Sequence, residues 1–311
     1  MGENEQGGML RNIIVLGAIL IIISMAIGGA LATKHNMRGT ISRANSEQSA
    51  PAATTASSSQ IIGTSRNISD SKYKYWTDEK SNTVSVTGPI DKTNKVVQIP
   101  ATVTNSGKKY TVTSIGASAF NDVGVTSLSL PDTIISIGTQ AFAGAKMTTL
   151  TLPGSVARIG DFAFSGANVG APSNLVTVTF KSPSQLRSIG ALAFAWNKIT
   201  SVNLPNSITF IGDQAFYENQ LTSVTLPTGI VAINRWTFSD NKLTSVTIPS
   251  SVTSIANGAF TRNQLTSVTI PSNVTSIGDS AFTSNKLTSV TVPNKSANID
   301  PGAFDGSVAI H

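Results

Sequence analysis

The strongest constraint on the fold is a phenylalanine that returns at nearly constant spacing through the C-terminal two thirds of the chain. Seven of the eight steps between these phenylalanines are 22 residues long and one is 30. Alanine precedes each of them except Phe238, which follows Thr237. A fixed period of about 20–29 residues is typical of a solenoid, in which every coil supplies the same core residue. The nine positions are Phe120, Phe142, Phe164, Phe194, Phe216, Phe238, Phe260, Phe282 and Phe304.

Each repeat also contains a strand pattern that a proline ends. In residues 243–249 (LTSVTIP), Val246 and Ile248 are two positions apart, so they point to the same face of a strand. Ser245 and Thr247 then point to the opposite face. Proline cannot donate a ladder hydrogen bond, so it stops the strand at a fixed place. Stacking such strands about 4.8 Å apart predicts a parallel β-sheet of short strands.

Two further columns accompany the phenylalanines. An asparagine column predicts a buried ladder in which each side chain bonds the backbone of the adjacent coil. It consists of Asn197, Asn219, Asn241, Asn263 and Asn285. A glycine column is expected to permit a turn in each coil, and it does not form a nucleotide-binding motif. It consists of Gly138, Gly160, Gly190, Gly212 and Gly278.

The repeat unit resembles a known family. The pattern L-x-x-V-x-I-P-x-x-V-x-x-I-G-x-x-A-F-x-x-N, and the stretch IPATVTNSGKKYTVTSIGASAF that precedes it, resemble the BspA-like (treponemal-type) subclass of bacterial leucine-rich repeats over residues 73–311. The resemblance implies a right-handed leucine-rich repeat solenoid. It also implies a surface-exposed or secreted protein, because members of this subclass are often linked to adhesion to host or matrix proteins.

An apolar run near the start of the chain defines the remaining segments. Residues 13–32 (IIVLGAILIIISMAIGGALA) carry no charge, and a helix of 20 residues spans about 30 Å, the thickness of a bilayer core. The sequence therefore predicts an N-terminal hydrophobic α-helix that enters a membrane. The predicted organisation is a leader at 1–12, a transmembrane or signal-like helix at 13–32, a flexible stalk at 33–70, a β-rich capping segment at 71–112 and the solenoid at 113–311.

Three fates of this helix stay open. It is retained as an anchor, or it is removed after the A-x-A site at residues 30–32. In the third, Gly8-Met9 and the apolar residues 13–17 resemble the leader of type IV pilins, where a peptidase cuts after glycine, and this resemblance implies filament self-assembly. The chain departs from the pilin pattern at Ile13, where pilins usually carry glutamate, and in its acidic residues 1–8.

The stalk indicates which side of the membrane the solenoid occupies. Residues 44–66 are rich in Ser, Thr and Ala and cannot bury enough apolar area to fold. Three basic residues, Lys34, Arg38 and Arg43, follow the apolar run. Because basic residues tend to stay on the cytoplasmic side of a membrane, they favour by themselves a cytoplasmic location for the repeat domain, but the orientation of long domains depends little on this rule. We expect a membrane-anchored protein with an extracellular repeat domain, and a secreted or pilus-associated protein is the alternative. Strand-like runs within 71–112 are expected to cover the open end of the first repeat.

The residue types exclude several kinds of chemistry. The chain has no cysteine, and its only histidines are His35 and His311, so thiolate, zinc-thiolate and histidine-based sites are excluded. The formal net charge of +6 comes from 22 basic and 16 acidic residues without long runs, which is weaker than a nucleic-acid-binding stripe. We expect no enzyme activity, no cofactor, no metal and no nucleic-acid partner.

Two surfaces are candidates for binding. The sheet face carries outward hydroxyls, and it is either a recognition surface, ordinary solvated β-structure or a regular array that fits ice. Its residues include Ser223, Thr225, Ser245, Thr247, Ser267 and Thr269. The edge patch follows the core phenylalanines and contains the Trp, Tyr and Arg types of interface hot spots, although ordinary surface variation is its alternative. Its residues are Trp196, Tyr217, Glu218, Asp240 and Arg262.

The one spacing of 30 residues between phenylalanines indicates an insertion of eight residues near 165–187. This insertion is either a binding loop or a tolerated insertion.

These observations together predict a non-catalytic cell-surface protein that binds a protein or glycan ligand of host or matrix type. The alternative is a pilin-like or filament-associated component that displays the solenoid.

Overall fold

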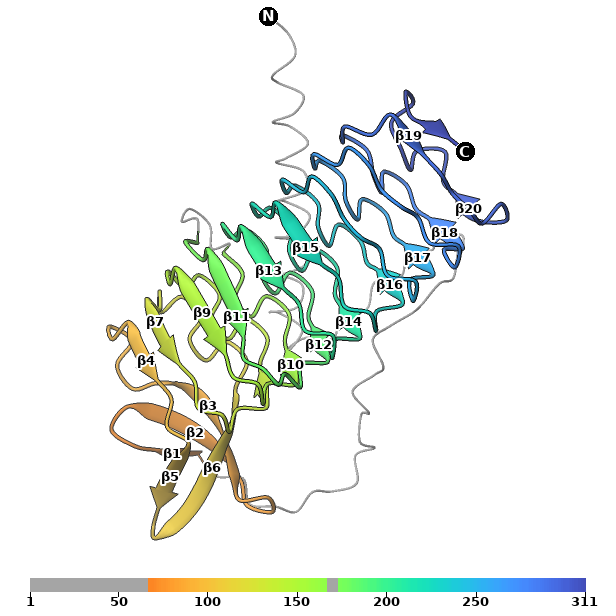
Figure 1. Cartoon of the computed structure of the whole chain (residues 1–311). Coiled ribbons are helices and arrows are strands. Elements are labelled where there is room, and N and C mark those ends of the chain that lie inside the picture. Colours follow the sequence, from red (N-terminus) through yellow and green to blue (C-terminus); the bar gives the residue numbers. More distant parts are fainter. Residues whose placement is uncertain (1–66, 167–172) are drawn as a thin grey trace, which may run out of the picture. The chain divides into compact units, whose positions relative to one another are not determined.

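The computed structural model describes residues 67–166 and 173–311. All regular structure in these two ranges is β-strand, and the coils follow one another from the N-terminal strands to the C-terminus (Figure 1). Within the two described ranges, no helix has the length and hydrophobicity needed to span a membrane. The predicted leader at 1–12, the hydrophobic helix at 13–32 and the stalk up to residue 66 lie outside the described residues.

The first sheet consists of the predicted short parallel strands. Val202 pairs with Val224, one repeat further on, and both side chains are buried. Single parallel bridges continue the pairing from Thr225 to Thr247 and from Thr247 to Thr269. The prediction of a parallel sheet is confirmed. The sheet consists of β9 (Thr149–Leu152), β11 (Thr177–Phe180), β13 (Ser201–Asn203) and β15 (Ser223–Thr225). β7 (Ser127–Ser129) and β19 (Ser289–Val290) occupy the equivalent position in other coils, but they pair with β4 (Val96–Gln98) and β21 (Ala309–Ile310).

A second set of parallel strands lies on the part of each coil between the first strand and the phenylalanine, where the sequence analysis predicted no strand. Every strand is two residues long, and its second residue is an isoleucine. The strands are β8 (Ser136–Ile137), β10 (Arg158–Ile159), β12 (Ser188–Ile189), β14 (Phe210–Ile211), β16 (Ala232–Ile233), β17 (Ser254–Ile255), β18 (Ser276–Ile277) and β20 (Asn298–Ile299). Each coil therefore contributes to two ladders, and the core lies between them.

The glycine column has a role beyond the expected one in a turn. A Cβ atom on Gly160 would lie 2.6 Å from the backbone nitrogen of Thr139, and one on Gly212 would lie 2.5 Å from that of Ala191. Real Cβ atoms do not approach backbone this closely, so glycine is required because neighbouring coils come into contact here. A turn does begin at these glycines, since the N–H of Ala163 donates to the carbonyl of Gly160 at 3.3 Å, but the close approach of the coils is what excludes a side chain.

The turns around the phenylalanines from Phe120 to Phe282 use left-handed backbone, mostly at residues that are not glycine. In one coil, Gln214 has φ 58° and Glu218 has φ 47° on either side of Phe216. The N–H groups of these three residues donate to the next coil at 2.8, 3.0 and 3.1 Å, while the N–H groups between them close turns within the coil. This alternation adds a third ladder between coils.

The phenylalanines form one continuous stack through the core. Successive rings lie 5.1 to 5.6 Å apart, with interplanar angles between 3° and 15°. The asparagine ladder runs beside the stack as predicted. Asn241 donates to the carbonyls of Phe216 (2.9 Å) and Phe238 (3.2 Å), and its Oδ1 accepts from the N–H of Leu221 (3.0 Å). Each asparagine thus satisfies backbone groups of two coils.

The N-terminal strands enter both sheets. The ring of Tyr73 meets Phe120 edge-on, with 6.0 Å between ring centroids, and so ends the phenylalanine stack. β4 pairs with β7 and β6 pairs with β8, so the first coil is continuous with this segment. The six strands are β1 (Asn67–Ser69), β2 (Tyr73–Asp78), β3 (Thr83–Pro89), β4 (Val96–Gln98), β5 (Thr102–Asn105) and β6 (Lys108–Ile115). The last, C-terminal strand is β21 (Ala309–Ile310), which pairs with β19.

Much of the segment 165–187, where the sequence analysis placed an insertion, belongs to a regular coil. Val178 in β11 pairs with Leu150, 28 positions earlier, and Ile189 in β12 pairs with Ile159, 30 positions earlier. Regular coils pair at an offset of 22. Six of the eight extra residues therefore precede β11 and two follow it. Residues 167–172, within the first group, lie outside the described part of the chain.

Candidate functional site

The sheet face presents hydroxyl groups in rows, as the strand alternation predicts. Ser223 and Thr225 are exposed, while Val224 between them is 8% exposed and packs into the core. The same alternation places Ser245, Thr247, Ser267 and Thr269 outward in the next two coils. Parallel pairing holds equivalent residues of successive coils side by side. The result is a flat polar surface with many hydrogen-bonding groups.

The edge patch lies at the phenylalanine turns, where residues 22 positions apart become neighbours. Trp196 is half-buried, and its ring meets the ring of Tyr217 edge-on at 6.0 Å with an interplanar angle of 87°. Leu192, Ala195 and Tyr217 form a small buried cluster, and Phe162 and Trp196 pack against it. This cluster is separate from the phenylalanine core, so it gives the turns of three successive coils an apolar surface of their own.

Tyr217 is the buried aromatic residue of the edge patch. Its side chain is only 7% exposed, which leaves Trp196 as the aromatic group that reaches solvent. Burial raises the pKa of the Tyr217 hydroxyl, and the nearby carboxylates of Asp240 and Glu218 raise it further. The phenol therefore stays protonated at neutral pH and remains available as a hydrogen-bond donor.

An ion pair borders the aromatic pair. Arg262 Nη1 lies 3.5 Å from Asp240 Oδ1, and the hydroxyl of Ser239 donates to the other oxygen of Asp240 at 2.6 Å. The Arg262 side chain is 49% exposed, whereas that of Asp240 is 18% exposed. The structure thus places the five residues of the edge patch in four successive coils, with Trp196, Glu218 and Arg262 among its accessible groups.

The sequence analysis missed two residues that complete this patch. Phe162 and Leu192 occupy the left-handed position two residues before the core phenylalanine, both with φ 56°. Serine or glutamine stands at this position in several other coils, as at Ser118 and Gln140. An apolar side chain at a position that is polar in several other coils was the available signal.

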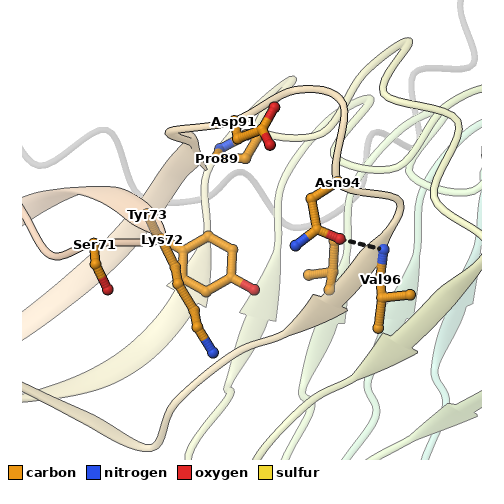
Figure 2. A pocket seen from close by; sticks show the side chains of 8 residues that line it. Ser71, Lys72, Tyr73, Pro89, Asp91, Asn94 and Val96 are labelled. Atoms are coloured by element: carbon orange, nitrogen blue, oxygen red, sulfur yellow. Dashed lines mark hydrogen bonds between the residues drawn. The ribbon is translucent and has the colours of Figure 1, made fainter.

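Two surface hollows lie away from the edge patch. Figure 2 shows the first, of about 200 Å³, between the start of β2 and β4. Its polar groups mostly close their own turns: Asn94 Oδ1 accepts from the N–H of Val96 at 3.0 Å, and Asp91 accepts from Thr93. The second, of about 250 Å³, includes Phe180 and Pro205. None of the sheet-face or edge-patch residues named in the sequence analysis lines either hollow, whereas Phe180, Lys181, Ser182 and Ser184 of the 165–187 segment line the second.

Comparison with solved structures identifies similar chains from bacteria. The chain is similar to a leucine-rich repeat protein from Bacteroides ovatus, with 27% identity and a TM-score of 0.62 over 75% of this chain. The match spans 66% of that protein, just under two thirds of its length. A leucine-rich cell surface protein from Faecalibacterium prausnitzii has 22% identity and a TM-score of 0.36, covering 78% of this chain and 86% of that one. The pneumococcal vaccine antigen PcpA has 21% identity and a TM-score of 0.41, covering 74% and 82%.

Comparison with family models gives the classification. No curated protein matches the chain at a significant level. The model of the BspA type leucine rich repeat region, however, matches residues 102–189 and 187–311 in 6 copies. These matches cover more than half of the chain and include every phenylalanine turn. The chain therefore belongs to the BspA-type leucine-rich repeat family.

Proposed function

We propose that this chain is a non-catalytic cell-surface protein whose solenoid binds a partner protein through the edge patch. The apolar run at 13–32 and the spacer at 44–66 support display of the solenoid outside the cell on a membrane anchor. Membership of a repeat family supports a binding role, since stacked repeats offer an extended surface of regularly placed side chains.

The observation that carries this proposal is the composition and rigidity of the edge patch. Trp, Tyr and Arg contribute most often to hot spots at protein interfaces, and all three occur in this patch. Contact with Tyr217 fixes the Trp196 ring before a partner arrives, so little side-chain entropy is lost on binding. The ion pair of Arg262 and Asp240 adds a polar rim beside the aromatic centre.

The experiment measures binding of the full-length protein to a panel of purified matrix and host-surface proteins by surface plasmon resonance. For the partner that binds, Trp196→Ala and Arg262→Ala are each expected to weaken Kd about 30-fold, as a hot-spot residue does. The matched control is Trp76→Ala, because Trp76 is 49% exposed on β2, outside the patch. Equal affinities for all three variants and the wild type would exclude the edge patch as the binding surface.

A second function, as a filament component, has one supporting observation: Gly8-Met9 stands before an apolar run, as in pilin leaders. N-terminal sequencing of the mature protein separates the alternatives. A start at Met9 supports the filament, a start at Met1 supports the retained anchor, and a start at Thr33 supports secretion.

A further inference from the structure

A row of lysines runs along the solenoid beside the sheet face. One position immediately precedes the first core residue of each strand segment, and across seven successive coils it alternates between lysine and a side-chain amide. The occupants are Lys146, Asn174, Lys198, Gln220, Lys242, Gln264 and Lys286. We call the four lysines the lysine row. Strict alternation over seven coils spaces the positive charges two coils apart.

The backbone holds this row in place. The N–H of Lys242 donates to the carbonyl of Leu221 at 2.9 Å, and Lys198 and Lys286 make the equivalent bond to the preceding coil at the same distance. The ammonium groups are directed along the row as well. Lys198 donates to Asn174 Oδ1 at 3.0 Å, and Lys242 and Lys286 donate to glutamine Oε1 atoms of the preceding coils at 3.3 and 3.4 Å. With strands about 4.8 Å apart, successive lysines lie about 9.6 Å apart.

The positive charge of the row is not neutralised within the described part of the chain. The ion pairs there involve Lys108, Lys181 and Arg262, and no member of the lysine row. Asp240 lies only two residues before Lys242, but its carboxylate pairs with Arg262. Regular uncompensated charge along one line attracts an anion that is itself long and regularly charged.

The surface beside the row favours a sugar polymer among linear anions. The exposed serines and threonines of the sheet face, such as Ser223 and Thr247, provide donors and acceptors for hydroxyl groups. Single-stranded nucleic acid binds instead on aromatic side chains that stack with its bases. The outward sheet positions from Ser201 to Thr269 carry only Ser, Thr and Asn.

We propose that the lysine row and the adjacent sheet face bind a linear acidic polysaccharide that lies along the solenoid axis. The two-coil spacing is about the length of an extended disaccharide, so one anionic group per disaccharide meets one lysine. This site lies outside the edge patch, and it therefore goes beyond the proposed function.

The test uses hyaluronan as the probe, since it is linear and carries one carboxylate per disaccharide. Binding to the detergent-solubilised full-length protein is measured at low ionic strength. The triple variant Lys198→Gln, Lys242→Gln, Lys286→Gln extends the amides already present in the row, so the fold is retained. It is expected to weaken Kd about tenfold. The matched control with the same charge change is Lys74→Gln, Lys109→Gln, Lys295→Gln, which is expected to bind as the wild type does.

Other arms of the experiment distinguish the alternatives. Hyaluronan esterified at its carboxylates is expected not to bind, and Trp196→Ala is expected to bind hyaluronan normally. Failure of the edge patch as a protein-binding surface would thus leave this result unchanged. The proposal is overturned if hyaluronan does not bind, if both triple variants lose affinity equally, or if poly(dT) binds more tightly and depends on the same lysines.

Discussion

The ladder asparagines satisfy backbone groups that water cannot reach. Asn241 is 7% exposed, donates to three carbonyls and accepts one N–H. Asn241→Leu would leave the buried N–H of Leu221 unpaired, which costs about 1–3 kcal/mol, whereas the three carbonyls would each keep one other donor. We expect the variant to lose about 1–3 kcal/mol of unfolding free energy in urea denaturation. Asn174→Leu, at an exposed position, is the control and should lose less than about 1 kcal/mol.

Gly258 makes room for an exposed tryptophan. Trp236 is 40% exposed, and a Cβ atom on Gly258 would lie 1.9 Å from its Cδ1. The φ of Gly258 is +64°, which costs a residue with a side chain about 1–2 kcal/mol. Gly258→Ala is therefore expected to destabilise the protein by at least that amount and to push the Trp236 ring into solvent.

Fluorescence measures this displacement. The emission of Gly258→Ala should shift to longer wavelength, and the shift should vanish in a Trp236→Phe background. Gly306→Ala is the control, because nothing lies within 4 Å of a Cβ atom at that position. An unshifted spectrum with unchanged stability would show that the ring does not rest on Gly258.

The residue columns were predictable because the period alone defines them. Spacing of 22 identified the phenylalanine stack and the asparagine ladder without any coordinates. The depth of individual side chains was not predictable in this way. Tyr217 was expected at the surface, but the apolar Phe162 and Leu192 of earlier coils build a cluster that buries it. The burial of a side chain in a solenoid therefore depends on which residues the neighbouring coils carry at the equivalent turn.

The shortest strands give the weakest sequence signal. The second set of strands has two residues per coil, too few to show the alternation that identifies a half-buried strand. The pairing of the second set of strands is interrupted between β14 and β16, and this interruption has a local cause. Gly212 donates its N–H to Ile189 at 2.9 Å, but one coil later Asn234 replaces the glycine, and its side-chain Nδ2 donates to Ile211 at 2.6 Å. A side chain thus makes the contact that the backbone makes elsewhere.

The turn that begins β2 depends on an ionised carboxylate. Burial raises the pKa of Asp70, but hydrogen bonds from the Tyr75 hydroxyl (2.6 Å) and from the N–H groups of Tyr73 and Lys72 outweigh burial and hold this pKa below its usual value. The folded pKa thus lies below the unfolded pKa of about 3.9. The stabilisation is complete above the unfolded value and is lost as pH falls through the folded value.

Asp70→Asn is therefore expected to lower stability at neutral pH and to flatten the fall in stability below about pH 4. Thermal unfolding monitored from pH 7 to pH 2 measures both effects. The exposed substitution Asp132→Asn is the control and should leave the acid slope as in the wild type. An Asp70→Asn variant with the wild-type acid slope would contradict the role given to this carboxylate.

At the scale of the whole molecule, the two proposed binding surfaces lie where coils depart from the consensus. Regular positions build the ladders and the core, and they are the same in most coils. The edge patch exists because four successive coils carry Trp196, Tyr217, Asp240 and Arg262 at turns where earlier coils have Ala143 and Gly144. The lysine row alternates at a position that the fold leaves free. Neither surface could be assigned a partner from the period, because the period describes only what the coils share.

Stability at this scale is a sum over neighbouring coils, so a defect in the middle of the stack acts on both sides. Phe238 is 1% exposed and lies 5.6 Å from the rings of both Phe216 and Phe260. Phe238→Ala is expected to cost about 3–5 kcal/mol through the cavity it leaves. It should also separate unfolding into two transitions, with faster amide exchange in the coils after residue 238. Phe304, which has one stacked neighbour at 5.2 Å, is the control, and Phe304→Ala should cost less and leave a single transition. If Phe238→Ala melted like the wild type, or if both variants cost the same, coupling through the phenylalanine stack would be wrong.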